Sequence, residues 1–141
     1  TGEGQMFADG KLRGAQIPFY NVDVEQAIAH VTHLEAESSL VIPQAGECDL
    51  AMCYMGRAMG DALPPGAVVL LKAVDRDAII PGGEYVIVRR KIVTLRIVRL
   101  ADGEDKLRLV AGDRENYDDI ILNVSDISSV YKVKGKLIIN S

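Results

Sequence analysis

The chain has 141 residues, of which 48% are hydrophobic and 26% charged, and its formal net charge is −4. This length predicts one domain with a single core, and this composition is typical of a globular protein. An acidic domain has no general electrostatic attraction for nucleic acid or for an anionic membrane, so any contact with DNA would come from elsewhere.

We find no signal-peptide pattern and no long apolar run, and therefore expect a cytoplasmic protein without membrane contact. Cys48 and Cys53 lie five residues apart in one predicted strand. Alternation along a strand places them on opposite faces, so we do not expect a disulfide between them. This use of cysteine fits a reducing compartment.

The first part of the chain divides into a tail and a helix. Residues 1–16 contain four glycines and few apolar residues, and we expect a flexible tail or linker to which a further domain could be attached. The folded domain is expected over residues 17–141. A helix is predicted over residues 24–36, with Asp23 as its N-cap. Its apolar positions follow the spacing of an amphipathic helix: Val24, Ala27, Ile28, Val31 and Leu34.

The next stretch predicts a strand, a tight turn and a second strand. The strands are expected over residues 48–55 and 67–72, because apolar runs bounded by glycine and proline are typical of strands. A glycine-flanked elbow joins them, and a small residue on such a turn is where enzymes often present a nucleophile. The residue at the tip is Ala58, which has no nucleophilic atom. The other elbow residues are Gly56, Arg57, Met59 and Gly60.

The remaining sequence predicts further short strands separated by glycine and aspartate turns. They are expected at residues 84–88, 92–100, 106–110, 120–124, 130–133 and 136–139, the last two flanking a turn at Lys134-Gly135. Several short strands at close spacing favour a mostly-β barrel or sandwich with one helix.

The order of these stretches resembles the catalytic core of LexA-type self-cleaving repressors. The segments that carry the resemblance are Cys48-Asp-Leu-Ala-Met52, Gly56-Arg-Ala-Met59 and Pro65-Gly-Ala-Val-Val-Leu-Leu-Lys72, followed by Pro81–Val88, Thr94–Leu100, Leu109–Asp118 and Val130–Lys136. Each segment alone is weakly specific, but their shared order over residues 17–139 is more so. The resemblance implies the coiled β-sheet of that family.

In that family a serine attacks an Ala-Gly bond of an upstream loop, with a neutral lysine as its base. The resemblance places Ala58 at the position of the serine and Arg96 at that of the lysine. Arginine stays protonated at any working pH and cannot be a base. The upstream segment, residues 22–27, contains no Ala-Gly pair. We therefore expect a degenerate dyad that is unable to self-cleave.

The resemblance implies the dimerisation and regulatory C-terminal domain of a phage-repressor-like regulator. Such a domain forms a homodimer and contacts DNA only through an N-terminal helix-turn-helix domain, and we expect no cofactor and no small-molecule ligand. Edge pairing of the C-terminal strand through Val133, Leu137 and Ile139 is one hypothesis for the dimer interface. Closure of the core by the same three residues is an equal alternative.

Two other functions remain open at this stage. The first is an active Ser–Lys self-cleaving peptidase whose serine was replaced in the laboratory, although this would not explain Arg96 or the missing cleavage pair. The second is a partner-binding module of the UmuD type, without a DNA-binding domain.

Three smaller signals favour structural roles. His30, His33 and Glu37 have a spacing that could bind a metal, but a solvated helix face is the preferred interpretation. The basic turn Arg89-Arg90-Lys91 is interpreted as a solvated hairpin tip rather than a phosphate site. Tyr117 is expected to pack its loop against the core.

Overall fold

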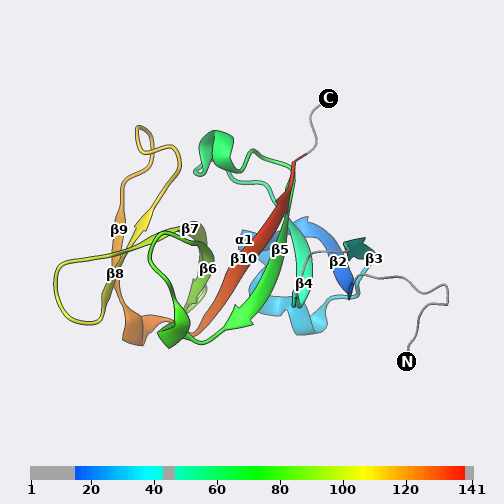
Figure 1. Ribbon diagram of the computed structural model, residues 1–141, viewed down its shortest axis with the longest axis horizontal. Helices are drawn as coiled ribbons and strands as arrows, with labels where there is room; N and C mark the ends of the chain where they lie inside the picture. The colour runs from blue at the N-terminus through cyan, green and yellow to red at the C-terminus, as the bar shows by residue number, and fades with distance from the viewer. Residues whose placement is uncertain (1–14, 43–46, 139–141) are drawn as a thin grey trace.

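Nine strands form one sheet in the computed structural model, which describes residues 15–42 and 47–138 (Figure 1). The strands are β2 (Ala15–Asp23), β3 (Ser38–Ile42), β4 (Leu50–Tyr54), β5 (Ala67–Val74), β6 (Glu84–Arg89), β7 (Ile92–Leu100), β8 (Lys106–Val110), β9 (Ile120–Asn123) and β10 (Ser129–Leu137). Their spatial order is β3-β2-β4-β5-β10-β6-β7-β8-β9. Only β2 and β4 are parallel; every other neighbouring pair is antiparallel. The prediction of a mostly-β fold is confirmed.

The core lies on both faces of the central strands, and β6 shows why. Successive side chains of a strand point to opposite faces. Val86 and Val88 enter the larger hydrophobic cluster, together with residues of β4. Tyr85 and Ile87 enter a second cluster with residues of β8. The sequence of a strand that is buried on both faces is a nearly continuous apolar run, and β6 has this pattern.

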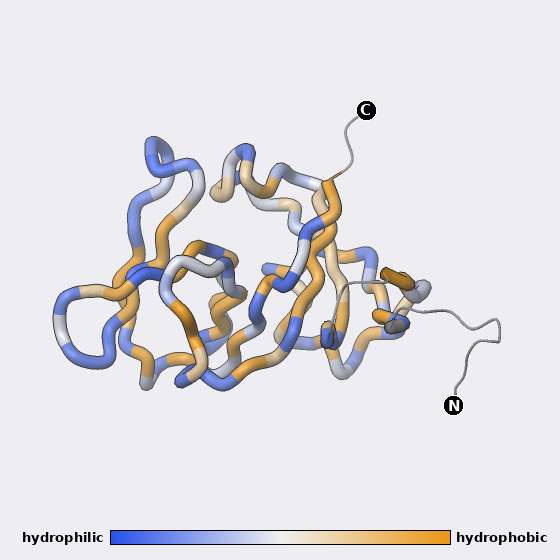
Figure 2. The backbone as a smooth tube through the Cα atoms, viewed as in Figure 1, coloured by the Kyte–Doolittle hydropathy of each residue, from blue (hydrophilic) through white to orange (hydrophobic). Residues whose placement is uncertain are grey.

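The paired strands β5 and β10 cross the middle of the molecule, with β2 and β3 on one side and β7 to β9 on the other (Figure 1). Apolar residues follow the crossing strands, and the outer loops around β8 and β9 are hydrophilic (Figure 2). The long pairing of β5 with β10, from Val130 opposite Val74 to Leu137 opposite Val68, joins the two halves of the sheet.

The helical segment is shorter than the sequence predicted. It consists of α1 (Val24–Ala27) and the 3-10 helix η1 (Ile28–His33), with a kink at His30, where φ is −117° and ψ is 18°. Asp23 does not cap it, because the carboxylate instead accepts a hydrogen bond from the Met55 N–H at 3.0 Å. No helix in the described part of the chain is long and apolar enough to cross a membrane.

Two further predictions differ from the observed elements, and two strands were not predicted. β2 begins at Ala15, two residues before the expected start of the folded domain, and the rest of the predicted tail, residues 1–14, lies outside the described residues. β2 and β3 were not predicted as strands. The predicted turn at Lys134-Gly135 is a bulge within one continuous strand, since the register of β10 on β5 shifts between Val133 and Gly135. The other predicted strands lie within two residues of the observed bounds.

The remaining helical turns are single 3-10 turns in the connections between strands. They are η2 (Gly60–Ala62), η3 (Arg76–Ala78) and η4 (Val124–Asp126). η3 and η4 are joined by Arg76, whose guanidinium donates hydrogen bonds to the carbonyl oxygens of Val124, Ser125 and Ile127 at 3.4, 3.2 and 3.2 Å. η2 follows the predicted elbow.

Candidate functional site

The elbow after β4 is present and its tip is buried. Ala58 and Met59 are 3% and 0% exposed, whereas Arg57 is exposed. Gly56 is required by a close approach, because a Cβ at this position would lie 2.6 Å from the Tyr54 hydroxyl oxygen. Gly60 is required by its backbone, with φ at 59°. The sequence therefore folds the elbow as predicted, but presents only the methyl group of Ala58.

The Tyr54 hydroxyl marks the centre of the site. The side chain is fully buried, and the hydroxyl makes no hydrogen bond of normal geometry with any described residue. Burial raises the pKa of Tyr54 to about 12, and the nearby Glu25 carboxylate adds to this. The Arg96 guanidinium and the backbone N–H groups of Met59 and Ala58 act in the opposite direction. The elbow and Arg96 thus lie around one hydroxyl group.

Arg96 projects from β7 into this site and is held on three sides. Its side chain is 11% exposed. The Nη1 group donates a hydrogen bond to the Leu95 carbonyl oxygen at 2.9 Å and lies 3.6 Å from Oε2 of Glu25. The guanidinium also lies over the ring of Tyr117, 5.7 Å from its centre. The buried Nε has no hydrogen-bond partner among the described residues.

Glu25 completes the site from α1. Its Oε2 accepts a hydrogen bond from the Leu95 N–H at 2.9 Å, so the carboxylate contacts both the backbone and the guanidinium of neighbouring residues on β7. Burial raises the pKa of Glu25, while the Leu95 hydrogen bond and Arg96 partly offset this. Glu25 belongs to residues 22–27, the segment in which the resemblance places the scissile bond. Glu25 therefore holds this segment against Leu95 and Arg96 of β7.

The arrangement lacks the groups that acyl transfer needs. Ala58 has no nucleophilic atom, and Arg96 cannot accept a proton. The Tyr54 hydroxyl is a poor nucleophile because its raised pKa keeps it protonated. Among the described residues no cluster of histidine, cysteine or carboxylate groups could hold a metal ion. His30 and His33 are exposed, in agreement with a solvated face.

Sequence reasoning missed Tyr54 and Glu25. Tyr54 was included in a predicted strand as one apolar residue among several, although it directly precedes the glycine-flanked elbow. Glu25 lay within the helix predicted over residues 24–36 and was given no role. The pairing of β2 with β4 places Tyr20 opposite Met52 and Asp23 opposite Cys53, and so brings Glu25 at the start of α1 near Tyr54 at the end of β4.

Alkaline titration should reveal the buried hydroxyl. The folded-state pKa of Tyr54 lies above the unfolded value of about 10, so folding favours the protonated form. Its contribution to stability is complete below the unfolded pKa and is lost as the pH rises toward about 12. The chain has five tyrosines and no tryptophan, so phenolate absorbance reports tyrosine alone.

We expect the wild-type protein to show a late titration step near pH 12 that is missing in Tyr54→Phe. The same measurement in denaturant is the control, because all phenols then titrate together. Superimposable folded-state curves for the two proteins would contradict this account of Tyr54.

The three residues of the predicted dimer interface do not share one environment in the structure. Val133 packs against the larger core cluster, which fits the core alternative, and Leu137 is 39% exposed. Ile139 lies outside the described residues. β10 is an interior strand, but its pairing with β6 stops at Lys132. From Val133 to Leu137 it pairs with β5 alone among the described strands.

The basic hairpin tip and Tyr117 can also be placed. Arg90 and Lys91 are exposed at the turn between β6 and β7, and Arg90 has a positive φ of 55°. Tyr117 is half-buried and its ring contacts the Arg96 guanidinium, so it faces the site. No protein-family model and no curated protein matches this chain.

Proposed function

We propose that this chain is the dimerisation and regulatory domain of a repressor-like transcriptional regulator that does not cleave itself. The observation that carries the proposal is that Ala58 and Arg96, at the positions that the resemblance assigns to the serine and the lysine, both lie near the Tyr54 hydroxyl. The elbow and β7 are folded, but position 58 holds alanine in place of the serine and position 96 holds arginine in place of the lysine. A domain of this kind retains its shape and its surfaces without the peptidase reaction.

The position of Glu25 supports a loss of activity that extends beyond the nucleophile. Its carboxylate is bound to the Leu95 N–H and lies beside the Arg96 guanidinium, so the upstream segment is fixed by an ion pair. A laboratory replacement of serine alone would leave a lysine at position 96 and an Ala-Gly pair upstream. Position 96 holds an arginine and residues 22–27 contain no Ala-Gly pair, which favours natural loss over engineering.

The partly unpaired strand β10 supports the dimer. From Val133 to Leu137 the backbone groups on one side have no strand partner in the described chain, and a second copy could pair there about a two-fold axis. Lys136 at this edge is held by Glu84 at 2.9 Å. Joining two weakly binding DNA-binding domains in this way would raise their affinity for a palindromic site through effective concentration.

Light scattering over a dilution series tests the dimer. We expect a mass about twice 15.3 kDa, which falls toward the monomer mass on dilution. Leu137→Asp should weaken the dimer at least about tenfold, because the symmetry places the two new charges near one another in the interface. Ile121→Asp is the matched control, since Ile121 is 53% exposed on β9 and the dimer should persist.

A monomer at every concentration would remove this proposal and favour a partner-binding module. The peptidase alternative has its own readout in the same samples. If Ala58→Ser produced cleavage fragments at mildly alkaline pH, where a lysine base is most active, the domain would be a peptidase rather than a dimerisation module. We expect the variant to remain intact.

A further inference from the structure

A basic groove lies on the face of the β7–β8 hairpin, separate from the degenerate dyad. Its volume is about 640 Å³, within the range of about 300–1,000 Å³ that is typical of ligand sites. Three arginines, Arg99, Arg108 and Arg114, line it, and no acidic residue does so in the described chain. A domain of net charge −4 thus concentrates positive charge in one concave place.

Two of these arginines form a like-charged pair across the sheet. Arg99 on β7 lies directly opposite Arg108 on β8 in the antiparallel register, so both side chains project from the same face. Neither is a member of the ion pairs found among the described residues, and like charges directly opposite each other destabilise a sheet. An anion bound between them would relieve this repulsion.

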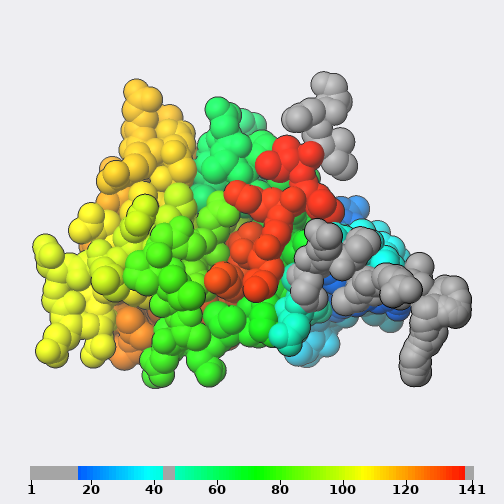
Figure 3. Space-filling view, in the orientation of Figure 1, coloured from blue at the N-terminus to red at the C-terminus, as the bar shows by residue number. Residues whose placement is uncertain are grey.

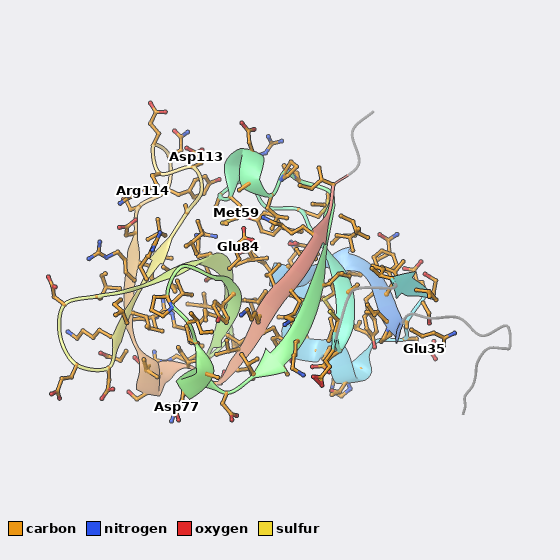
Figure 4. All side chains as sticks on the ribbon, viewed as in Figure 1. Glu35, Met59, Asp77, Glu84, Asp113 and Arg114 are labelled. Carbon is orange, nitrogen blue, oxygen red and sulfur yellow. The ribbon has the colours of Figure 1, made fainter. Side chains whose placement is uncertain are left out.

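Contacts with the elbow hold the loop that carries the third arginine, Arg114. Gly112 lies so close to Met59 that a Cβ would overlap its carbonyl group, and the Asp113 N–H donates to the Ala58 carbonyl oxygen at 2.8 Å. These contacts fix the loop that carries Arg114 beside η2 (Figure 4). In the space-filling view this loop stands as a separate column at the upper left (Figure 3). Arg114 is paired with Asp119 at 3.2 Å, so its charge is partly neutralised.

Apolar side chains accompany the charges. Ile97 and Val110 are opposite one another on the hairpin and line the groove with Leu100, which is 66% exposed. The wall near Arg99 is the turn at Gly82, whose ideal Cβ position is 3.6 Å from Nη1 of Arg99. Ligand recognition here would combine guanidinium–anion bonds with burial of apolar surface.

We propose that this groove binds an acidic peptide segment of a partner protein. One carboxylate of the peptide lies between Arg99 and Arg108, and a neighbouring apolar side chain covers Leu100 and Ile97. Charge complementarity carries the choice of an acidic partner. The apolar lining favours a peptide over nucleic acid, because a phosphate backbone has no apolar group to bury against these residues.

Fluorescence anisotropy with a labelled short peptide of alternating glutamate and leucine tests the proposal. The wild-type domain should bind this peptide, and added salt should weaken the binding. The matched peptide with glutamine in place of glutamate should bind at least about tenfold more weakly, because the charge-assisted hydrogen bonds are lost. Arg99→Gln/Arg108→Gln should cause a similar loss.

Arg90→Gln is the control variant, since it removes one exposed positive charge beyond the other end of β7 and should leave binding unchanged. Thermal unfolding shows whether the double variant folds; it should be at least as stable as the wild type, because the facing like charges are gone. Equal binding of the two peptides, full binding by the double variant, or no binding at all would overturn the proposal. Displacement of the peptide by duplex DNA or by inorganic phosphate at similar concentration would also overturn it and assign the groove to phosphate.

Discussion

Replacing Glu25 by alanine should lower the free energy of unfolding by about 3 kcal/mol, as expected when one partner of a mostly buried ion pair is removed. The change takes the hydrogen-bond acceptor from the Leu95 N–H and leaves the Arg96 guanidinium, 11% exposed, without a counter-charge. Arg96 would keep its bond to the Leu95 carbonyl and its contact with Tyr117, which limit the loss. Chemical denaturation measures the effect.

A double replacement separates the ion pair from ordinary packing. Glu25→Leu/Arg96→Met removes both charges and keeps similar volume, so it should recover most of the stability. Glu35→Ala is the matched control, because Glu35 is an exposed carboxylate and its removal should change stability by no more than about 0.5 kcal/mol. If Glu25→Ala lowered the free energy of unfolding by no more than Glu35→Ala does, the Arg96 charge would need no partner.

The Glu25 carboxyl group should also make the free energy of unfolding depend on pH. Its pKa is raised in the folded state, chiefly by burial, so the folded protein binds this proton more readily than the unfolded chain. The stabilising effect of that proton is complete below the unfolded pKa and is lost as the pH rises through the raised folded pKa. The stability advantage of wild type over Glu25→Gln should therefore increase as the solution is acidified across this interval.

Strands and the elbow were predictable because their signals are local. Apolar runs bounded by turn residues such as glycine and aspartate define β6, β7 and β8. Their observed bounds differ from the predicted ones by at most one residue. Glycine at positions 56 and 60 marks the elbow for two different physical reasons, a close contact and a positive φ. The prediction of Ala58 at its tip required only the order of residues.

The helix cap and the polar centre of the site depend on contacts that are distant in sequence. Asp23 has a residue type and position suited to an N-cap, yet its carboxylate binds the Met55 N–H, 32 residues away. Glu25 meets the Leu95 N–H across 70 residues. A tertiary hydrogen bond of this kind overrides local propensity, and no residue spacing along the chain predicts it. The β2–β4 pairing, parallel and non-local, was missed for the same reason.

Replacing Gly112 by alanine should cost about 3 kcal/mol or more of unfolding free energy, because backbone cannot move aside as a side chain can. An added Cβ would overlap the Met59 carbonyl group and lie 3.0 Å from its Cα. Either the loop or the elbow would have to shift. The Asp113 N–H, bonded to the Ala58 carbonyl oxygen at 2.8 Å, should then exchange with solvent much faster, as hydrogen exchange can measure.

Gly66→Ala is the control that separates steric overlap from backbone strain. Gly66 has φ at 94° and nothing within 4 Å of its ideal Cβ position, so its replacement should cost only about 1–2 kcal/mol through conformation alone. A Gly112→Ala protein as stable as wild type, with Asp113 still protected, would show that the loop does not rest on the elbow. The expected result gives the elbow a structural role, because it supports the loop that carries Arg114.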